Sequence, residues 1–139
     1  VFNRFLTFQD VPMLLLDWMQ TFVTSKTVFL IMTIILLLIV GLFMDSISAI
    51  LIVAPLLMYT AISYEVDLIH LGIIFIIGLE IGYLTPPVGI NLFVSCGLFN
   101  KPFAQVIKAS VPYSFCLLIV LILVTFIPEI ALYLTEFVE

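Results

Sequence analysis

The chain has 139 residues; 65% are hydrophobic, 9% are charged, and the formal net charge is −5. A soluble domain carries roughly 25% charged residues, so this composition indicates an integral membrane protein. Nine acidic residues against four basic ones argue against nucleic-acid binding. The apolar runs are continuous rather than alternating, which favours an all-α, polytopic membrane protein.

The first segment, residues 1–25, holds no apolar run long enough to cross a membrane. Residues 1–8 look like the tail of a preceding element, so we expect either part of a longer chain or a separately encoded piece. In residues 9–22, apolar side chains such as Leu14 and Trp18 recur at helical spacing between polar ones. This pattern predicts an amphipathic helix in the membrane interface. A helix that only connects two elements is the alternative.

The second segment, residues 26–64, consists of two apolar runs, residues 27–44 and 47–62, separated by Asp45 and Ser46. Two arrangements fit this pattern. In the first, two full membrane spans are joined by a very tight turn. In the second, two helices enter and leave the membrane on the same side and form a re-entrant hairpin.

The tip of such a hairpin, residues 41–48, carries the polar groups of this segment. Gly41 permits a sharp turn, and the hydroxyl of Ser46 can bond free backbone groups nearby. A carboxylate inside a membrane segment indicates a functional site, which makes Asp45 a candidate. If the turn lies at the membrane surface instead, Asp45 is a solvated helix cap.

The third segment, residues 65–99, contains the most informative stretch. After a short acidic loop, residues 68–82 predict one helix and residues 90–99 predict a second. Pro86 and Pro87 lie between them, lack an N–H donor and clash with the preceding turn, so one unbroken helix is excluded. In hydrocarbon, backbone groups freed by such a break persist only when they are buried in protein or line a cavity.

Polar residues lie on both sides of this break. Glu80 is about 18 Å into a helix that starts at residue 68, past the bilayer midplane, and Asn91 follows the break by one turn. An uncharged, hydrogen-bonded carboxyl is the alternative role for Glu80. His70, near the helix start, is more simply an interfacial residue. Secondary transporters build ion and substrate sites from discontinuous helices of this kind, and we favour that interpretation.

The last segment, residues 100–139, begins with Lys101 and Lys108, which predict a cytoplasmic connector. Residues 111–127 predict the final transmembrane helix, and the acidic tail after it is expected on the external side. Arg4 and Lys26, in the first two segments, would then lie near the external side, which counts against this orientation.

Several stretches, in this order and spacing, resemble the C-terminal part of the large membrane subunit of TRAP transporters. These are tripartite ATP-independent periplasmic carriers of bacteria and archaea. The most specific stretch is Leu-Thr-Pro-Pro-Val-Gly-Ile-Asn at residues 84–91. Val-Gly-Leu-Phe-Met-Asp at residues 40–45 and Ile-His-Leu-Gly-Ile-Ile-Phe at residues 69–75 add weight by their order. The resemblance covers residues 12–128.

This resemblance implies half of an elevator-type secondary transporter, with a re-entrant helical hairpin followed by a broken transmembrane helix. Residues 41–48 would then form the hairpin tip and face the break, and residues 9–22 would form an arm helix. Sodium sites would lie where tip and break meet. The implied ion-binding residues are Gly41, Asp45, Thr85, Pro86 and Gly89, and the implied substrate-binding residues are Ser46, Glu80 and Asn91.

The resemblance also implies a function: sodium-coupled uptake of a carboxylate, such as a C4-dicarboxylate or sialic acid, across a bacterial or archaeal inner (plasma) membrane. The implied partners are a small membrane subunit and a periplasmic solute-binding protein. No resident cofactor is expected, because sodium is the coupling ion. The sequence contains no nucleophile–base pair or phosphate loop, so we do not expect an enzyme.

Two alternatives remain open at this stage. The first is a single-chain, ion-coupled anion transporter of the same superfamily that works without a binding protein. The second is a membrane subunit of an enzyme complex in which Asp45 and Glu80 relay protons. A proton relay requires more ionisable residues in a line than the apolar segments contain.

Overall fold

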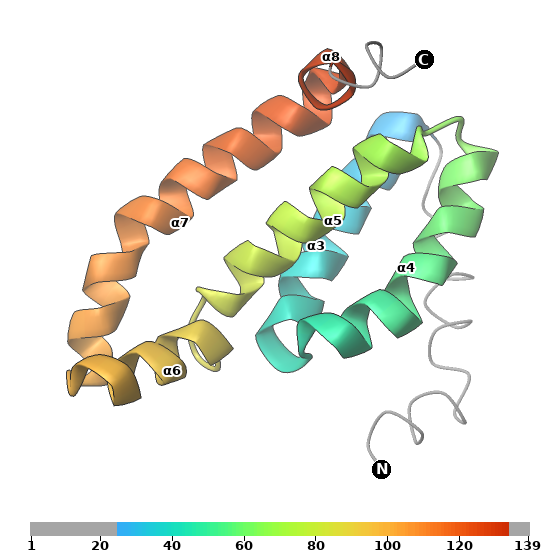
Figure 1. The fold of residues 1–139 in the computed structure, drawn as a ribbon. Coiled ribbons are helices and arrows are strands. Elements are labelled where there is room, and N and C mark those ends of the chain that lie inside the picture. The colour runs from blue at the N-terminus through green and yellow to red at the C-terminus, as the bar shows by residue number, and fades with distance from the viewer. Residues whose placement is uncertain (1–24, 134–139) are drawn as a thin grey trace.

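The computed structural model describes residues 25–133, and every regular element in that range is a helix (Figure 1). The helices are α3 (Lys26–Phe43), α4 (Ser46–Ser63), α5 (Leu68–Tyr83), α6 (Ile90–Phe99), α7 (Phe103–Phe126) and α8 (Pro128–Leu132). By length and composition α3, α4 and α7 can cross a membrane, whereas α5 and α6 are shorter apolar helices. The predicted all-α fold is confirmed for this range, and the amphipathic helix predicted for residues 9–22 lies outside it.

The helices α3 and α4 form an antiparallel hairpin (Figure 1). At its open end, the ammonium group of Lys26 donates a hydrogen bond of 3.0 Å to the carbonyl oxygen of Glu65. Figure 1 shows that α4 bends along its length, as the position of Pro55 inside this helix predicts. Two full spans and a re-entrant hairpin share this arrangement, so re-entry stays a prediction.

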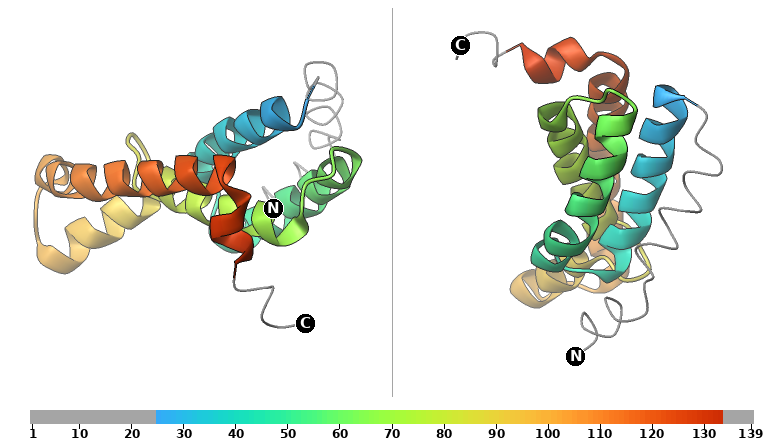
Figure 2. Two further views of the ribbon diagram at one scale, coloured as in Figure 1. Left: turned by 90° about the horizontal axis from the view of Figure 1, so that it is seen from above. Right: turned by 90° about the vertical axis from the view of Figure 1, so that its right-hand side faces the viewer.

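The centre of the described fold is α5, which α3, α4, α7 and α8 all contact. Figures 1 and 2 show α5 between α7 on one side and the α3–α4 hairpin on the other. Its sequence is apolar on all faces, as expected of a helix that is packed from several sides. The core in which it takes part includes Phe29, Leu37, Leu57, Leu121 and its own Ile74, each at most 1% exposed.

A close contact between two glycines joins α3 to α5. A Cβ atom added to Gly82 would lie 2.7 Å from the Cα of Gly41, and one added to Gly41 would lie 2.8 Å from the carbonyl oxygen of Leu79. Because these neighbours are backbone atoms, neither helix can hold a larger side chain here without moving. The contact therefore fixes the last turn of α3, just before the hairpin tip, against the last turn of α5.

The helix α7 packs on α5 through its C-terminal half. His70 is 1% exposed, and its Nε2 lies 2.8 Å from the carbonyl oxygen of Val124, so it joins α5 to α7; its location at the membrane interface stays a prediction. The helix α7 starts at Phe103, well before the span predicted for residues 111–127, and it continues through Pro112. Much of its outer face is apolar and exposed, which suits contact with lipid or with protein beyond the described range.

Candidate functional site

The break predicted between α5 and α6 is confirmed. The helix α5 ends at Tyr83 and α6 begins at Ile90. In between, the backbone N–H of Thr85 donates to the carbonyl oxygen of Gly82 over 3.0 Å, and the Thr85 hydroxyl donates to the carbonyl oxygen of Ile81 over 2.6 Å. These bonds satisfy carbonyl groups that the end of a helix otherwise leaves free.

Gly89 provides the backbone turn that starts α6. Its φ angle is +41°, in the left-handed region that other residues enter at a cost of roughly 1–2 kcal/mol. An added Cβ atom would also lie 2.8 Å from Cδ1 of Leu92 and 3.0 Å from the carbonyl oxygen of Thr85. Only glycine fits this position, so the structure gives Gly89 a role in shaping the break. Its predicted contact with an ion stays a prediction.

Asp45 caps the N-terminus of α4 at the hairpin tip. Its Oδ2 accepts from the backbone N–H of Ser48 over 3.0 Å, and its Oδ1 accepts from the Ser48 hydroxyl over 2.6 Å. Both bonds use the carboxyl group as an acceptor, so they stabilise its ionised form. Asp45 itself is exposed in the described chain, which leaves it accessible to a ligand.

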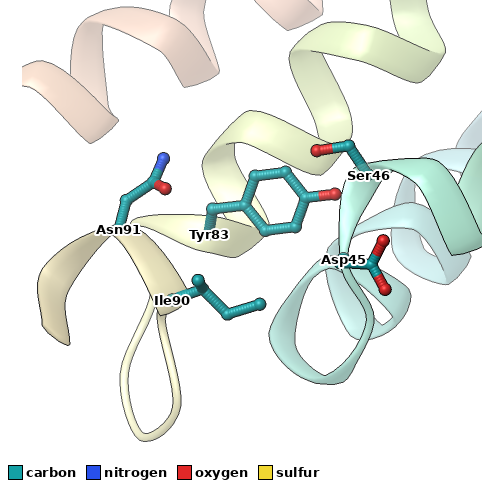
Figure 3. Close-up of a pocket in the computed structure, with 5 residues that line it drawn as sticks. All are labelled: Asp45, Ser46, Tyr83, Ile90 and Asn91. Atoms are coloured by element: carbon teal, nitrogen blue, oxygen red, sulfur yellow. The ribbon is translucent and has the colours of Figure 1, made fainter. Parts of the chain in front are cut away.

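The hairpin tip and the helix break meet at a small pocket of about 80 Å³, which we call the tip pocket. Figure 3 shows its five lining residues, which come from three parts of the fold. The tip contributes a carboxylate and a hydroxyl, α5 contributes a phenol, and α6 contributes its first residues. The lining residues are Asp45, Ser46, Tyr83, Ile90 and Asn91.

Two helix N-termini adjoin the tip pocket, those of α4 and α6. The N-terminus of α4 is capped by Asp45, whereas α6 has no side-chain cap. The first N–H groups of a helix have no acceptor within the helix, and the helix dipole adds a partial positive charge at that end. The start of α6, at Ile90 and Asn91, is therefore suited to bind an anion.

Glu80 and Asn91 contact each other across the break. The Asn91 Nδ2 donates to Oε1 of Glu80 over 3.0 Å, and both side chains are half-buried. Glu80 does not itself line the tip pocket, and its hydrogen bond orients Asn91, which does. The structure confirms that the Glu80 carboxyl is hydrogen-bonded, while its uncharged form and its contact with the substrate stay predictions. The structure thus places Ser46 and Asn91 in one pocket and Glu80 behind it.

The structure does not gather the predicted ion-binding residues into one cavity of the described range. Asp45 lines the tip pocket, whereas Thr85 and Pro86 line a separate, mostly apolar cavity of about 260 Å³ against α7. Gly41 is buried in the contact with Gly82 and has a packing role. Ion binding by these residues stays a prediction. The described structure places them in separate locations rather than in one shared site.

Sequence reasoning missed Tyr83, which lines the tip pocket and is 6% exposed. The residue lies inside the recognisable stretch next to the two prolines, and its polar hydroxyl in an apolar run was the available signal. An aromatic residue in such a run is normally a packing residue, so the sequence pattern alone does not mark Tyr83 as part of a site.

Comparison with known proteins gives a consistent result. Residues 1–130 match the family described as "Tripartite ATP-independent periplasmic transporter, DctM component". The C4-dicarboxylate TRAP transporter large permease protein DctM of Pseudomonas aeruginosa is 40% identical over 132 residues, which are 95% of this chain and 31% of that protein. The isethionate TRAP transporter permease protein DctMQ of Oleidesulfovibrio alaskensis is 38% identical over 133 residues, 96% of this chain and 21% of that protein.

A further relative is named for a different solute. The sialic acid TRAP transporter large permease protein SiaM of Vibrio cholerae is 33% identical over 136 residues, which are 98% of this chain and 32% of that protein. The chain thus spans about a third or less of the length of these relatives.

Proposed function

The chain belongs to the family of DctM components of tripartite ATP-independent periplasmic (TRAP) transporters, and we propose that it contributes the sodium-coupled carboxylate site of a large permease subunit. The observation that carries this proposal is the tip pocket, where a hairpin-tip carboxylate, the end of α5 and the uncapped start of α6 meet. The relatives named for C4-dicarboxylate, isethionate and sialic acid support an anionic solute.

The start of α6 is the proposed anchor for the carboxylate group. The free N–H groups of Ile90 and Asn91 point to an acceptor-only ligand, and no side chain of the described range caps this helix. Asn91, held by Glu80, adds a polar side chain of fixed orientation next to these groups. The hydroxyl of Ser46 reaches the same pocket from the hairpin tip. The remainder of the solute extends out of this small pocket.

Asp45 provides the reason why a cation must accompany the solute. Two like charges about 4 Å apart repel by about 4 kcal/mol at an effective dielectric constant of 20. A sodium ion bound at Asp45 removes this repulsion and adds an attraction of the same kind. Ion and carboxylate therefore raise each other's affinity for the site, and transport is coupled without any covalent chemistry.

A second cation position follows from the predicted role of Thr85 on the α7 side of the break. Its hydroxyl proton is donated to the carbonyl oxygen of Ile81, so its lone pairs remain for a hard cation, which prefers oxygen ligands. Pro86 lines the same cavity. In this proposal the tip pocket couples the ion to the solute, and the Thr85 position adds a further coupling ion.

The length of α5 supports a re-entrant hairpin. Its 16 residues rise about 24 Å, less than the roughly 30 Å of a hydrocarbon core, so an α5 that starts at the membrane surface would end inside the membrane. Because the tip pocket joins Asp45 to the break, the hairpin tip reaches the same depth. We propose that hairpin and broken helix move together, as in elevator-type transporters.

The proposed partners are those that define a tripartite transporter: a small membrane subunit and a periplasmic solute-binding protein that delivers the carboxylate. The proposed location is the inner membrane of a bacterium or archaeon. The apolar outer faces of α4 and α7 are available for lipid or for the remainder of the permease.

We predict that the complete transporter carrying this chain takes up a carboxylate in proteoliposomes only when a sodium gradient and the loaded binding protein are both present. The reason is that sodium must neutralise Asp45 before the anion binds. The assay compares sodium with potassium gradients, with and without the binding protein, for succinate and sialic acid. Uptake without a binding protein would favour a single-chain transporter, and uptake driven equally by potassium would contradict sodium coupling.

A further inference from the structure

The Tyr83 hydroxyl is a buried polar group without a partner. The residue is 6% exposed, and its hydroxyl oxygen has no hydrogen bond within the described structure. A buried hydroxyl left unpaired destabilises a protein by about 1–3 kcal/mol. Such a group calls for an explanation, and a ligand that completes its hydrogen bond is one.

The position of the hydroxyl indicates which ligand completes it. Figure 3 shows the Tyr83 ring between Asn91 on one side and the hairpin tip on the other, with its hydroxyl directed toward the tip. The phenol therefore spans the tip pocket from the last residue of α5. Its hydroxyl is directed toward Asp45 and Ser46, which line the same pocket.

We propose that the Tyr83 hydroxyl is a binding residue that donates a hydrogen bond to the carboxylate group of the transported solute. This inference rests on the proposed function and adds a donor that the family resemblance does not supply. A neutral phenol is a hydrogen-bond donor that an anion can accept from, and its ring excludes water from one side of the bond. A cation would gain less binding energy from Tyr83 than an anion, because only the weakly basic phenol oxygen could act as its ligand.

Because its ring is fixed, Tyr83 is also expected to discriminate between solutes. Gly82, the preceding residue, is held against Gly41, so the backbone that carries the ring cannot shift freely. The hydroxyl thus marks a fixed position for one oxygen of the carboxylate, between the tip and α6. Solutes whose anionic group cannot place an oxygen there are expected to bind more weakly.

The test is Tyr83→Phe in the complete transporter, with carboxylate binding followed by titration calorimetry at saturating sodium. The probe is succinate, or the carboxylate that the wild-type transporter takes up. Loss of a hydrogen bond to a charged group should raise the Kd about tenfold or more. The unfolding temperature should stay the same or rise, because phenylalanine fills the same space without an unpaired hydroxyl.

Tyr59→Phe is the matched control, since Tyr59 lies on α4 with 75% of its surface exposed and away from the tip pocket. It should change neither Kd nor unfolding temperature. An unchanged Kd for Tyr83→Phe would overturn the inference, as would a fall in unfolding temperature that accounts for the weaker binding. A change in the sodium concentration that gives half-maximal binding, measured at saturating carboxylate, would show that the hydroxyl contacts the ion. That result would also overturn the inference. A wild-type transporter that binds no carboxylate would overturn the proposed function itself.

Discussion

Replacing Asp45 by asparagine is expected to lower sodium-dependent carboxylate uptake by about a hundredfold or more. The substitution removes the charge that attracts the ion, and a unit charge about 4 Å from a cation contributes about 4 kcal/mol at an effective dielectric constant of 20. Asparagine caps helices about as well as aspartate, so α4 should still begin at the same residue. Uptake in proteoliposomes under a sodium gradient measures the effect.

Asp67→Asn is the matched control for this prediction. Asp67 caps α5 as Asp45 caps α4, with Oδ1 accepting from the backbone N–H groups of Ile69 and His70 over 2.8 and 3.1 Å. It does not line the tip pocket. Uptake by this variant should be close to that of the wild type. If Asp45→Asn and Asp67→Asn behave alike, capping rather than ion binding accounts for the role of Asp45.

Replacing Gly82 by alanine is expected to destabilise the protein by about 1–3 kcal/mol or more, the usual effect of overpacking. The added methyl group would lie 2.7 Å from Cα of Gly41 and 2.9 Å from its carbonyl carbon, so the helix backbones must separate. Because this contact also holds the hairpin tip against the break, the variant should lose uptake together with stability. Thermal unfolding of the purified complete transporter measures the first effect and uptake the second.

Gly72→Ala provides the matched control on the same helix. A Cβ atom at Gly72 meets nothing within 4 Å, so the substitution tests helix propensity without a clash. Alanine favours a helix by up to about 1 kcal/mol over glycine, so stability should be unchanged or higher. Equal losses in the two variants would show that glycine as such, and not the close contact with Gly41, matters in α5.

The features that the sequence predicts well are those that depend on local chemistry. Pro86 and Pro87 stop a helix wherever they occur, so the break is readable from the sequence. The polar pair Asp45 and Ser46 between two apolar runs likewise locates the hairpin tip. Both predictions rest on what a residue does to its own backbone, and tertiary packing does not change that.

Features that depend on distant parts of the chain were not predictable in the same way. His70 pairs with the carbonyl of Val124, 54 positions away, and an apolar sequence gives no sign of such a partner. The hydroxyl of Thr85 bonds the preceding turn of α5, and Thr85 lines a cavity against α7 rather than the tip pocket with Asp45. The hydroxyl of Tyr83 is visible in the sequence as a polar group in an apolar run, but its place in the tip pocket depends on the tip facing the end of α5.

The most direct test of the central claim, that the tip pocket binds the ion and the carboxylate together, is protection of a single cysteine at Ser46. The variant Ser46→Cys is made in a complete transporter whose native cysteines are replaced, and its rate of modification by a small polar thiol reagent is measured. Ser63→Cys, at the far end of α4, is the control. We predict that sodium and carboxylate together slow modification at residue 46 about tenfold, that neither alone does so, and that residue 63 is unaffected. Modification at residue 46 that proceeds equally fast with both ligands, in a variant that still transports, would contradict the account.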